Sequence, residues 1–539
     1  MPCRWRVLAC ASLILNITAI PAAAEMARGV VYEDTNGSGT RDATEPGLER
    51  MLISNGRDVV ATDAEGRYEI EVDDDDFIFI IKPRDWMVPV DARGIPRFFY
   101  HHCPAGAPAL KYPGVAPTGP LPASIDFPLT RHPEPDTIRV ILFGDPQPST
   151  IDQVNDFARD IAPDVIAELA DPASPAFGAA FGMTLGDIVH DDLSLYQPLA
   201  EVMSTVGLPW FTVPGNHDLN YDAPDDARSL AHFHSVFGPS TYAFQWGRTT
   251  FFVIDDVVYE GPKPDGSDGP YHAEFTADQL AFIRGVMGEA DPGFMVFTMH
   301  IPLVDVRNRK DFLWIVGDRP AVSIGSHWHR HADRWLGVDG EPVPEGSAHP
   351  GHHVIVQAAT CGSWWQGAHD EFGIPHSTMR DGAPNGWSVL EITRLGYEVR
   401  FKGARKEWSM QMHIWAPDEV DARMRMLHEV IVNVHAGSEQ SIVEMRVSTP
   451  GTGEATPWIA MEQFRGVDPY WARMKELEQT DLKQTGSNLT NANAEGLLWR
   501  ATFPPGLPRG GHLIEVRTTD QYGNVYTERH IVRVTDGSR

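Results

Sequence analysis

The sequence predicts an α/β core flanked by two small all-β domains. From about residue 137 to 400, short apolar runs alternate with segments whose apolar residues recur at helical spacing, and this alternation is typical of α/β proteins. On both sides of that region, short runs of alternating apolar and polar residues lie between turn-forming residues, as in β domains. We therefore expect a β domain over residues 25–132, an α/β domain over 133–405 and a second β domain over 406–539.

Residues 1–24 have the pattern of a secretory signal peptide. Arg4 and Arg6 precede an apolar run from Val7 to Ile20, and three alanines, Ala22 to Ala24, resemble a cleavage site. The apolar run is short for a membrane-spanning helix. We expect export to a bacterial periplasm or secretion, with no integral membrane segment left after cleavage.

The chain is strongly acidic. Its 539 residues include 44 Lys and Arg against 74 Asp and Glu, giving a formal net charge of −30. This balance makes nucleic acid and anionic lipid unlikely partners, since both would be repelled. It does not exclude a phosphorylated substrate, because bound metal ions would reverse the local field. Cys103 and Cys361 would be the cysteines left after cleavage, either paired in a disulfide or as two buried thiols.

The N-terminal β domain contains a loop with calcium-site spacing. Its expected strands are residues 30–32, 51–53, 59–60, 68–71, 77–81 and 124–129. Between the first two strands, Asp34, Asn36, Ser38, Thr40, Asp42 and Glu45 occupy positions 1, 3, 5, 7, 9 and 12 of an EF-hand-like loop, with Gly39 at position 6. The sequence leaves two interpretations open: a calcium site at Asp34, Asn36, Ser38, Asp42 and Glu45, or a glycine-rich hairpin with turn-forming side chains.

Apolar runs and helical spacing also predict the strands and helices of the central and C-terminal regions. Expected central strands are residues 138–143, 183–185, 210–213, 251–254 and 295–298, and residues 151–170 have helical spacing. Thr276 and Gln279 form a capping-box pattern that begins another helix. In the C-terminal domain, the expected strands are 428–434, 442–447, 513–518 and 525–534, with a short helix over 470–477.

Polar side chains follow the central strands where each strand ends. These groups are Asp145-Pro146-Gln147, Gly186-Asp187, Gly215-Asn216-His217-Asp218, His300 and His327-Trp328-His329. Ligands of α/β proteins gather at the carboxyl ends of strands. Mixed oxygen and nitrogen donors suit two adjacent divalent ions such as manganese, iron or zinc. No thiolate belongs to the set, which argues against a structural cysteine-zinc site.

As a set, these motifs resemble those of the calcineurin-like metallophosphoesterases, whose pattern runs D-x-H, G-D, G-N-H-[DE], H and G-H-x-H. The resemblance covers about residues 137–400. The N-terminal and C-terminal β regions, together with Gly362-Ser363-Trp364-Trp365 and residues 381–386, resemble parts of one bacterial subgroup. The implied fold of the central domain is a four-layer α/β sandwich with two central sheets.

The resemblance implies a role for each residue of the set. Asp145, Gln147, Asp187 and His329 would hold one metal ion, and Asp187, Asn216, His300 and His327 the other. His217 would sit beside the metals and Asp218 would orient it. Two positions depart from the family pattern: Gln147 replaces the usual His, and Ser326 replaces the Gly before the His-x-His pair.

These residues predict hydrolysis of phosphoric esters. Two close cations can share a hydroxide that attacks phosphorus, while a protonated His217 assists the leaving oxygen. The substrate, a phosphorylated small molecule or a phosphoprotein, stays open, as does the choice between mono- and diesterase. The alternative is a non-catalytic envelope binding module on a degenerate phosphoesterase core, which the substitution at Gln147 keeps open. A nuclease is disfavoured by the lack of a basic stripe.

Other polar residues near the motifs have two interpretations each. His190, Asp191 and Asp192 could support the metal centre or solvate a loop. The segment 331–386 is rich in His and Trp, so it could recognise substrate or pack as core. Trp364 belongs to this segment, and the sequence leaves both roles open for it.

Overall fold

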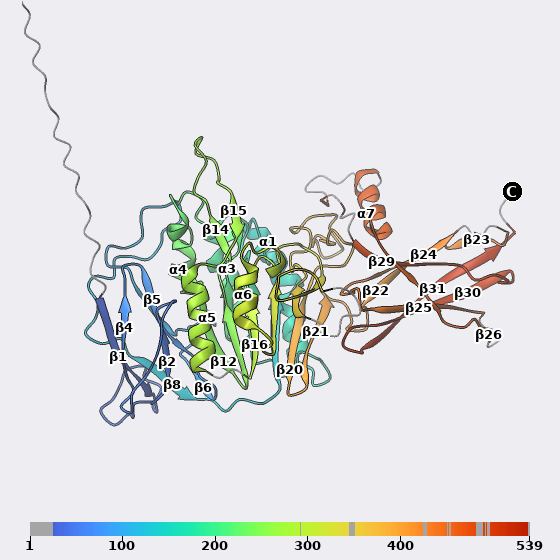
Figure 1. Ribbon diagram of the computed structural model, residues 1–539. Helices are drawn as coiled ribbons and strands as arrows, with labels where there is room; N and C mark the ends of the chain where they lie inside the picture. Colours follow the sequence, from blue (N-terminus) through green and yellow to red (C-terminus); the bar gives the residue numbers. More distant parts are fainter. Residues whose placement is uncertain are drawn as a thin grey trace, which may run out of the picture.

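The computed structural model describes residues 25–536, except for 291–292, 344–350, 424–427, 450, 452–453, 481–488, 491 and 493–495. The expected signal peptide, residues 1–24, lies outside the described residues. Figure 1 shows three regions in a row: β strands near the N-terminus, a central α/β region and a C-terminal β region. The protein is therefore a mixed α/β protein with several sheets, as the sequence predicts.

The N-terminal region forms two small sheets. One has the strand order β4-β1-β8-β6, namely β4 (Arg67–Val72), β1 (Glu25–Glu33), β8 (Phe127–Arg131) and β6 (Trp86–Met87). The other has the order β3-β2-β5-β7, namely β3 (Val59–Ala61), β2 (Leu52–Ser54), β5 (Asp76–Ile81) and β7 (Phe99–His102). Strict alternation explains β4, where Tyr68, Ile70 and Val72 are buried and the residues between them are exposed.

Two larger sheets make up the central region. The first has the order β11-β10-β9-β20-β21, namely β11 (Trp210–Val213), β10 (Phe181–Leu185), β9 (Ile138–Phe143), β20 (Gly386–Thr393) and β21 (Gly396–Gly403). The strands β9, β10 and β11 run parallel, so their carboxyl ends lie at one edge. They are almost wholly buried, which fits their continuous apolar runs.

The second central sheet has the order β12-β13-β16-β17-β19-β18. Its strands are β12 (Tyr242–Trp246), β13 (Thr249–Val253), β16 (Phe294–Thr298), β17 (Ala321–Gly325), β19 (His352–Val356) and β18 (Ala332–Leu336). β13, β16, β17 and β19 are parallel, whereas β12 and β18 pair antiparallel at the two edges. A separate hairpin joins β14 (Val257–Tyr259) to β15 (Tyr271–Ala273).

Six α-helices lie between the described strands of the central region. They are α1 (Ile151–Asp160), α2 (Ala162–Ala170), α3 (Tyr196–Ser204), α4 (Ala231–Phe237), α5 (Ala277–Glu289) and α6 (Arg309–Val316). The segment 151–170 forms two helices because Pro163 lies in the first turn of α2, where it cannot continue α1. The capping box predicted at Thr276 and Gln279 is confirmed at the start of α5.

The N-terminal sheets and the central region share one hydrophobic core, which runs from Ala27 to Ala404. Phe79 of β5 packs edge-on against Phe282 of α5, with ring centroids 5.8 Å apart. The buried Lys82 ammonium lies 2.5 Å from the Glu134 carboxylate. The N-terminal sheets are thus packed onto the central region rather than tethered to it.

The C-terminal region has a core of its own, built around residues such as Val432 and Trp499. One sheet has the order β22-β24-β29-β28, namely β22 (Met412–Trp415), β24 (Glu429–Val434), β29 (Gly496–Thr502) and β28 (Glu462–Gly466). The other joins β23 (Glu419–Asp421), β31 (Val525–Thr535), β30 (Gly510–Thr519), β25 (Ile442–Thr449), β26 (Glu454–Ala455) and β27 (Ile459–Ala460). Helix α7 (Pro469–Thr480) confirms the short helix expected there.

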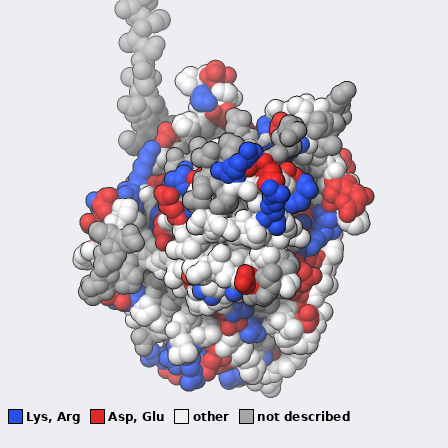
Figure 2. All heavy atoms as spheres, turned by 90° about the vertical axis from the view of Figure 1, so that its right-hand side faces the viewer, with Lys and Arg blue, Asp and Glu red and all other residues white. Residues whose placement is uncertain are grey.

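Helix α7 links the C-terminal region to a loop of the central region. Glu478 is buried, and its carboxylate accepts a hydrogen bond from the Ala368 amide at 2.8 Å and contacts His376 Nε2 at 2.8 Å. Figure 2 shows the end of the molecule formed by the C-terminal region, where acidic and basic side chains lie interspersed. Among the described residues, no helix is both long and apolar enough to cross a membrane.

Candidate metal centre

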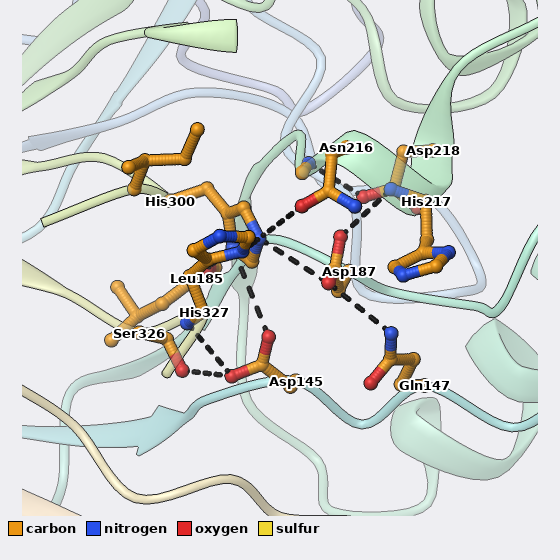
Figure 3. Close-up of polar contacts among 12 residues, drawn as sticks. Asp145, Gln147, Leu185, Asp187, Asn216, His217, Asp218, His300, Ser326 and His327 are labelled. Atoms are coloured by element: carbon orange, nitrogen blue, oxygen red, sulfur yellow. Dashed lines mark hydrogen bonds and ion pairs between the residues drawn. The ribbon is translucent and has the colours of Figure 1, made fainter. Parts of the chain in front are cut away.

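The polar groups predicted from the sequence meet at one place. Each follows the carboxyl end of a strand: Asp145 follows β9, Asp187 follows β10, Asn216 follows β11, His300 follows β16, and His327 and His329 follow β17. Figure 3 shows the labelled members facing a common centre. His329 Nε2 lies 4.0 Å from Asp145 Oδ1, although nearly two hundred residues separate them in sequence.

The backbone turns sharply at these residues. Asp145, Gln147, Asp187, His327 and His329 have positive φ angles of 39°, 43°, 47°, 66° and 51°. Non-glycine residues adopt this region at a cost of about 1–3 kcal/mol each, and such strain clusters at functional sites. A glycine is required beside them: a Cβ on Gly186 would meet His300 Nδ1 at 2.3 Å.

Asp187 lies in the middle of the cluster. Its Oδ2 is 3.2 Å from His300 Nε2 and accepts a hydrogen bond from the Gln147 amide at 3.2 Å. Its Oδ1 accepts the backbone N–H of His217 at 2.9 Å. Asp187, His300 and His327 offer donor atoms that all lie within 4.8 Å of one another. One carboxylate therefore faces donors from several strands, as a bridging ligand must.

Asp145 is fully buried and only half satisfied. Its Oδ2 accepts hydrogen bonds from the Ser326 hydroxyl and, at 3.2 Å, from the His327 backbone N–H. Its Oδ1 has no hydrogen-bond partner among the described residues. A buried carboxylate oxygen without a partner is costly, and a cation beside it would remove that cost. The structure thus fits a metal ion at this carboxylate.

Backbone carbonyls orient the histidines. His300 Nδ1 contacts the Leu185 carbonyl at 2.8 Å, and His329 Nδ1 contacts the Gly362 carbonyl at 2.7 Å. Each contact favours a proton on Nδ1 and turns Nε2 toward the centre. His300 Nε2 lies 3.2 Å from Asn216 Oδ1 and 3.1 Å from His327 Nδ1.

The electrostatics of the cluster favour bound cations. Burial raises the pKa of Asp145 to about 7, whereas the charges of His300 and His217 outweigh burial and lower the pKa of Asp187. Burial and the His300 charge lower the pKa of His327 to about 3. Burial also lowers the pKa of His329, to about 4. Both imidazoles are therefore neutral, which is the state that binds metal.

His217 and Asp218 do not pair as predicted. The Asp218 carboxylate is buried and accepts the backbone N–H groups of Gly215 at 2.7 Å and Ile188 at 3.1 Å. The His217 ring instead contacts Asp191, with Nδ1 2.8 Å from Oδ1. The prediction that Asp218 orients His217 is wrong, because Asp218 is occupied in fixing the turn and Asp191 takes that place.

Gln147 lies at the centre but turns its amide group away from ligation. Its Nε2 donates to Asp187, and its Oε1 lies 3.7 Å from the buried Cys361 sulfur. The two ends of a glutamine amide differ little in shape, so a turn of the group would present the oxygen to a metal ion.

Cys103 and Cys361 are both free and buried, so the disulfide alternative is wrong.

Sequence reasoning missed residues that hold the cluster in place. Asp256 Oδ1 accepts the backbone N–H groups of His300 and Ile301 at 3.2 Å each. Tyr196 donates its hydroxyl to the Asp218 carboxylate at 2.9 Å. Neither residue belongs to a recognisable motif, and only the fold brings them together. Asp191 carried a signal, since it lies a few residues after Asp187.

The predicted calcium loop is closed by its own hydrogen bonds. Asp34 accepts the amides of Ser38 at 3.1 Å and Gly39 at 2.8 Å. Glu45 accepts the amides of Thr35 and Asp42, both at 2.9 Å. Calcium binding there stays a prediction.

Within the His- and Trp-rich segment 331–386, residues 344–350 lie outside the described residues.

Comparison with known protein families matches two parts of the chain, and the second part begins within the central region. Residues 35–111 match the family described as the N terminal of Calcineurin-like phosphoesterase, and residues 355–526 match the C terminal of Calcineurin-like phosphoesterase. No curated protein sequence matches the chain.

The solved structures that resemble the protein are distant. One is a purple acid phosphatase from yellow lupin (Lupinus luteus) seeds, with 10% identity, coverage of 66% of this chain and 67% of that one, and a TM-score of 0.31. Another is a superoxide reductase from Ignicoccus hospitalis, with 12% identity, coverage of 23% and 80%, and a TM-score of 0.14. Scores this low tell nothing about the fold or activity of this chain. The two family matches show that the chain carries the N- and C-terminal regions of a calcineurin-like phosphoesterase.

Proposed function

We propose that the protein is a metal-dependent hydrolase of phosphoric esters, built on a four-layer α/β sandwich. The observation that carries this proposal is the meeting of Asp187 with His300 and His327 beside the half-satisfied Asp145. The two family matches support the same activity. A binding surface alone would have no need for buried, unpaired donors of this kind.

The donors divide into two ligand sets. Asp145, Gln147, Asp187 and His329 would hold one divalent ion, and Asp187, Asn216, His300 and His327 the other, with manganese, iron or zinc as the expected metals. When bound, two such ions lower the pKa of a water molecule towards about 7 and offset charge on the phosphoryl oxygens.

Residues of the chain supply the proton for the leaving group. Asp187 fixes the turn that carries His217 through its hydrogen bond to the His217 amide. The charges of Asp187 and Asp191 outweigh burial and raise the pKa of His217 to about 9. Its side chain is 23% exposed, so a proton on its ring can reach a substrate. His217 donates that proton to the leaving oxygen as the phosphorus–oxygen bond breaks.

The test is an Asp187→Asn variant. We expect loss of most bound metal and a fall of a hundredfold or more in hydrolysis of bis(p-nitrophenyl) phosphate, because the variant lacks the shared carboxylate. Asp136→Asn serves as the control, since Asp136 forms an ion pair with Arg394 at the surface. Full metal content and full activity in Asp187→Asn would reject the proposal.

A second candidate is a non-catalytic binding module on a degenerate core. It is favoured by one observation, the Gln147 amide that donates to Asp187 instead of facing a metal with its oxygen. The substitution Gln147→His distinguishes the two. Wild-type protein that holds metal, turns over no ester and gains activity in Gln147→His would favour the binding module.

Export and partner class also belong to the proposal. The pattern of residues 1–24 supports cleavage after Ala24 and location in a bacterial periplasm or outside the cell. The substrate is a phosphorylated small molecule or a phosphoprotein rather than nucleic acid, in keeping with the net charge of −30. N-terminal sequencing of protein from a periplasmic fraction tests the export. An uncleaved Met1 in the cytoplasm would contradict it.

A further inference from the structure

Three side chains of types that bind metal ions lie together in the N-terminal region, and none of them belongs to the candidate metal centre. They are Asp75, His101 and Cys103, and their donor atoms all lie within 4.8 Å of one another. The ring nitrogen His101 Nε2 is 2.9 Å from Asp75 Oδ1. A carboxylate, an imidazole and a thiol at this spacing can share one small ion, so the cluster is a candidate metal site of its own.

The pairing of β5 with β7 brings these residues together. The two strands run antiparallel with Phe77 opposite His101, and the Asp75 amide donates to the His102 carbonyl at 2.7 Å. The same register places Asp75 opposite Cys103, two residues further along. Because side chains two residues apart project from the same face of a sheet, all three candidate ligands lie on one face.

The cluster is shielded from water and held in place by its surroundings. The His101 side chain is 9% exposed, and its ring stacks on Phe77 with centroids 4.0 Å apart. His101 Nδ1 is buried without a hydrogen-bond partner among the described residues. Cys103 is buried too, and its amide donates to the Thr118 hydroxyl at 3.0 Å. The side chains are therefore positioned before any ligand binds, which lowers the cost of binding.

The cluster lies where the N-terminal sheets meet the central region. Phe77 of β5 packs against His234 of α4 with ring centroids 5.1 Å apart, and Figure 1 shows β5 beside α4. Arg228, in a short 3₁₀ helix of the central region, forms an ion pair with Asp75 Oδ2. The other carboxylate oxygen, Oδ1, is the one that faces His101. A carboxylate accepts several partners at once, so Arg228 leaves room for an ion at Oδ1.

The donor types favour zinc over harder ions. Zinc accepts sulfur, nitrogen and oxygen ligands, whereas calcium and magnesium take oxygen ligands. Burial and the neighbouring Asp75 carboxylate raise the pKa of Cys103 to about 11, so the free thiol keeps its proton at neutral pH. A zinc ion would displace that proton, because the metal binds the thiolate. Cys103 is thus a poor nucleophile and a suitable zinc ligand.

We propose that Asp75, His101 and Cys103 form a mononuclear zinc site, in addition to the candidate metal centre. Three protein ligands leave one of four tetrahedral positions for a water molecule. As the zinc–sulfur bond forms, the thiol proton passes to the solvent. The bound ion ties the residue before β5 to the residue after β7, at the contact with the central region. This site does not depend on the proposed phosphoesterase function.

Cobalt(II) is the probe for this site, since it replaces zinc and a thiolate ligand gives it a characteristic charge-transfer band in the near ultraviolet. The full-length protein is freed of metal with a chelator and titrated with cobalt(II). We expect the band to appear, and to disappear when zinc is added in excess. The predicted ligands of the candidate metal centre include no thiolate, so cobalt bound there gives no such band. Binding of cobalt without the band would overturn the proposal.

The two buried cysteines provide a matched pair of variants. Cys103→Ala should remove the band, whereas Cys361→Ala should keep it. Cys361 is a stringent control, because its sulfur lies 3.7 Å from Gln147 Oε1 at the candidate metal centre. Circular dichroism checks that each variant is folded. A band that survives in Cys103→Ala, or that is lost from folded Cys361→Ala, would assign the thiolate to another cysteine and overturn the proposal.

A second pair of variants leaves both cysteines in place. Asp75→Asn keeps the shape of the side chain, and Asn tolerates the φ of 73° found there. It should weaken cobalt binding about tenfold or more, read from the titration of the same band. Asp74→Asn is the control, since the Asp74 side chain is 73% exposed and does not belong to the cluster. Equal affinities in Asp75→Asn and the unaltered protein would contradict the proposal, whatever the protein does with phosphoric esters.

Discussion

At the scale of single residues, the partners of His217 show that residues adjacent in sequence need not contact each other in the fold. Asp218 follows His217 directly, yet successive residues of a helical turn point in different directions. Asp218 therefore points into the protein and anchors Gly215 and Ile188, while Asp191 reaches the His217 ring from another loop. The fold, rather than position next to His217 in the sequence, therefore determines which carboxylate contacts the His217 ring.

The first prediction follows from that contact. Asp191→Asn should lower kcat about a hundredfold for glycerophosphoinositol, a diester whose alkyl alcohol is a poor leaving group, because such a leaving group depends on the proton held by His217. The loss should be smaller for bis(p-nitrophenyl) phosphate, whose leaving group needs little proton assistance. Steady-state kinetics on the two esters measures the difference.

The control for this prediction is the next residue. Asp192→Asn removes a carboxylate that accepts from Ser194 and Tyr112 and does not touch the His217 ring. It should leave the ratio between the two esters unchanged. Equal losses on both esters in Asp191→Asn would show that Asp191 does not act through the proton.

At the scale of elements, the centre depends on how each strand ends. The apolar runs predicted the strands β9, β11, β13 and β16, and the polar groups after them predicted which side chains meet. That much is local, because strand period and strand-end position can be read from short windows. The partners Asp256 and Tyr196 were not predictable, since their contacts depend on packing between segments far apart in sequence. The short hairpin β14–β15 gave no strong pattern either.

The second prediction concerns the turn after β10. Gly186→Ala should lower the metal content and activity at least tenfold, because the added Cβ would meet the His300 ring at 2.3 Å. Metal analysis of purified protein, together with the ester assay, measures this effect.

Gly207→Ala is the matched control. Gly207 has a φ of 78°, close to the 87° of Gly186, but a Cβ there would meet nothing within 4 Å. Both variants carry the same backbone strain, of about 1 kcal/mol, and only one disturbs the centre. The same metal content in both variants would mean that the contact with His300 is unimportant.

At the scale of the whole molecule, buried charge joins the N-terminal sheets to the central region. Lys82 Nζ contacts Glu134 at 2.5 Å and donates to the Gln245 carbonyl at 2.8 Å. Burial lowers the pKa of Lys82, opposed by the Glu134 charge. Removal of one member leaves the other charged and buried, which is far more costly than removal of both.

The third prediction uses this asymmetry. Lys82→Met should lower the free energy of unfolding by about 3–5 kcal/mol, measured by denaturant titration. The double variant Lys82→Met, Glu134→Gln should recover much of that loss, because no unpaired charge remains. A double variant less stable than Lys82→Met would contradict the argument.

The fourth prediction concerns acid. Burial and the neighbouring His353 lower the pKa of His352 from its ordinary value of 6.5 to about 3. The unfolded chain takes up a proton as the pH falls through 6.5, and the folded protein does not until about pH 3. Stability is therefore complete above pH 6.5 and falls below it by up to about 1.4 kcal/mol per pH unit for this group.

His352→Gln tests the acid effect while keeping a donor for Ser323, whose hydroxyl lies 2.7 Å from His352 Nε2. The free energy of unfolding of the variant should depend less steeply on pH between 6 and 4 than that of the unaltered protein. His369→Gln, at an exposed position, should show the original slope. Identical slopes in all three proteins would contradict the prediction.

Thr490 lines a cavity together with Gln147 and Trp364, and this has a consequence for how related proteins can differ at the candidate metal centre. Thr490 belongs to the C-terminal region, and Glu478 of the same region fastens the loop around Ala368. A chimera that exchanges the C-terminal region between relatives would therefore change one wall of that cavity. Recombination at this joint can reshape the space beside the centre and leave every predicted metal ligand untouched.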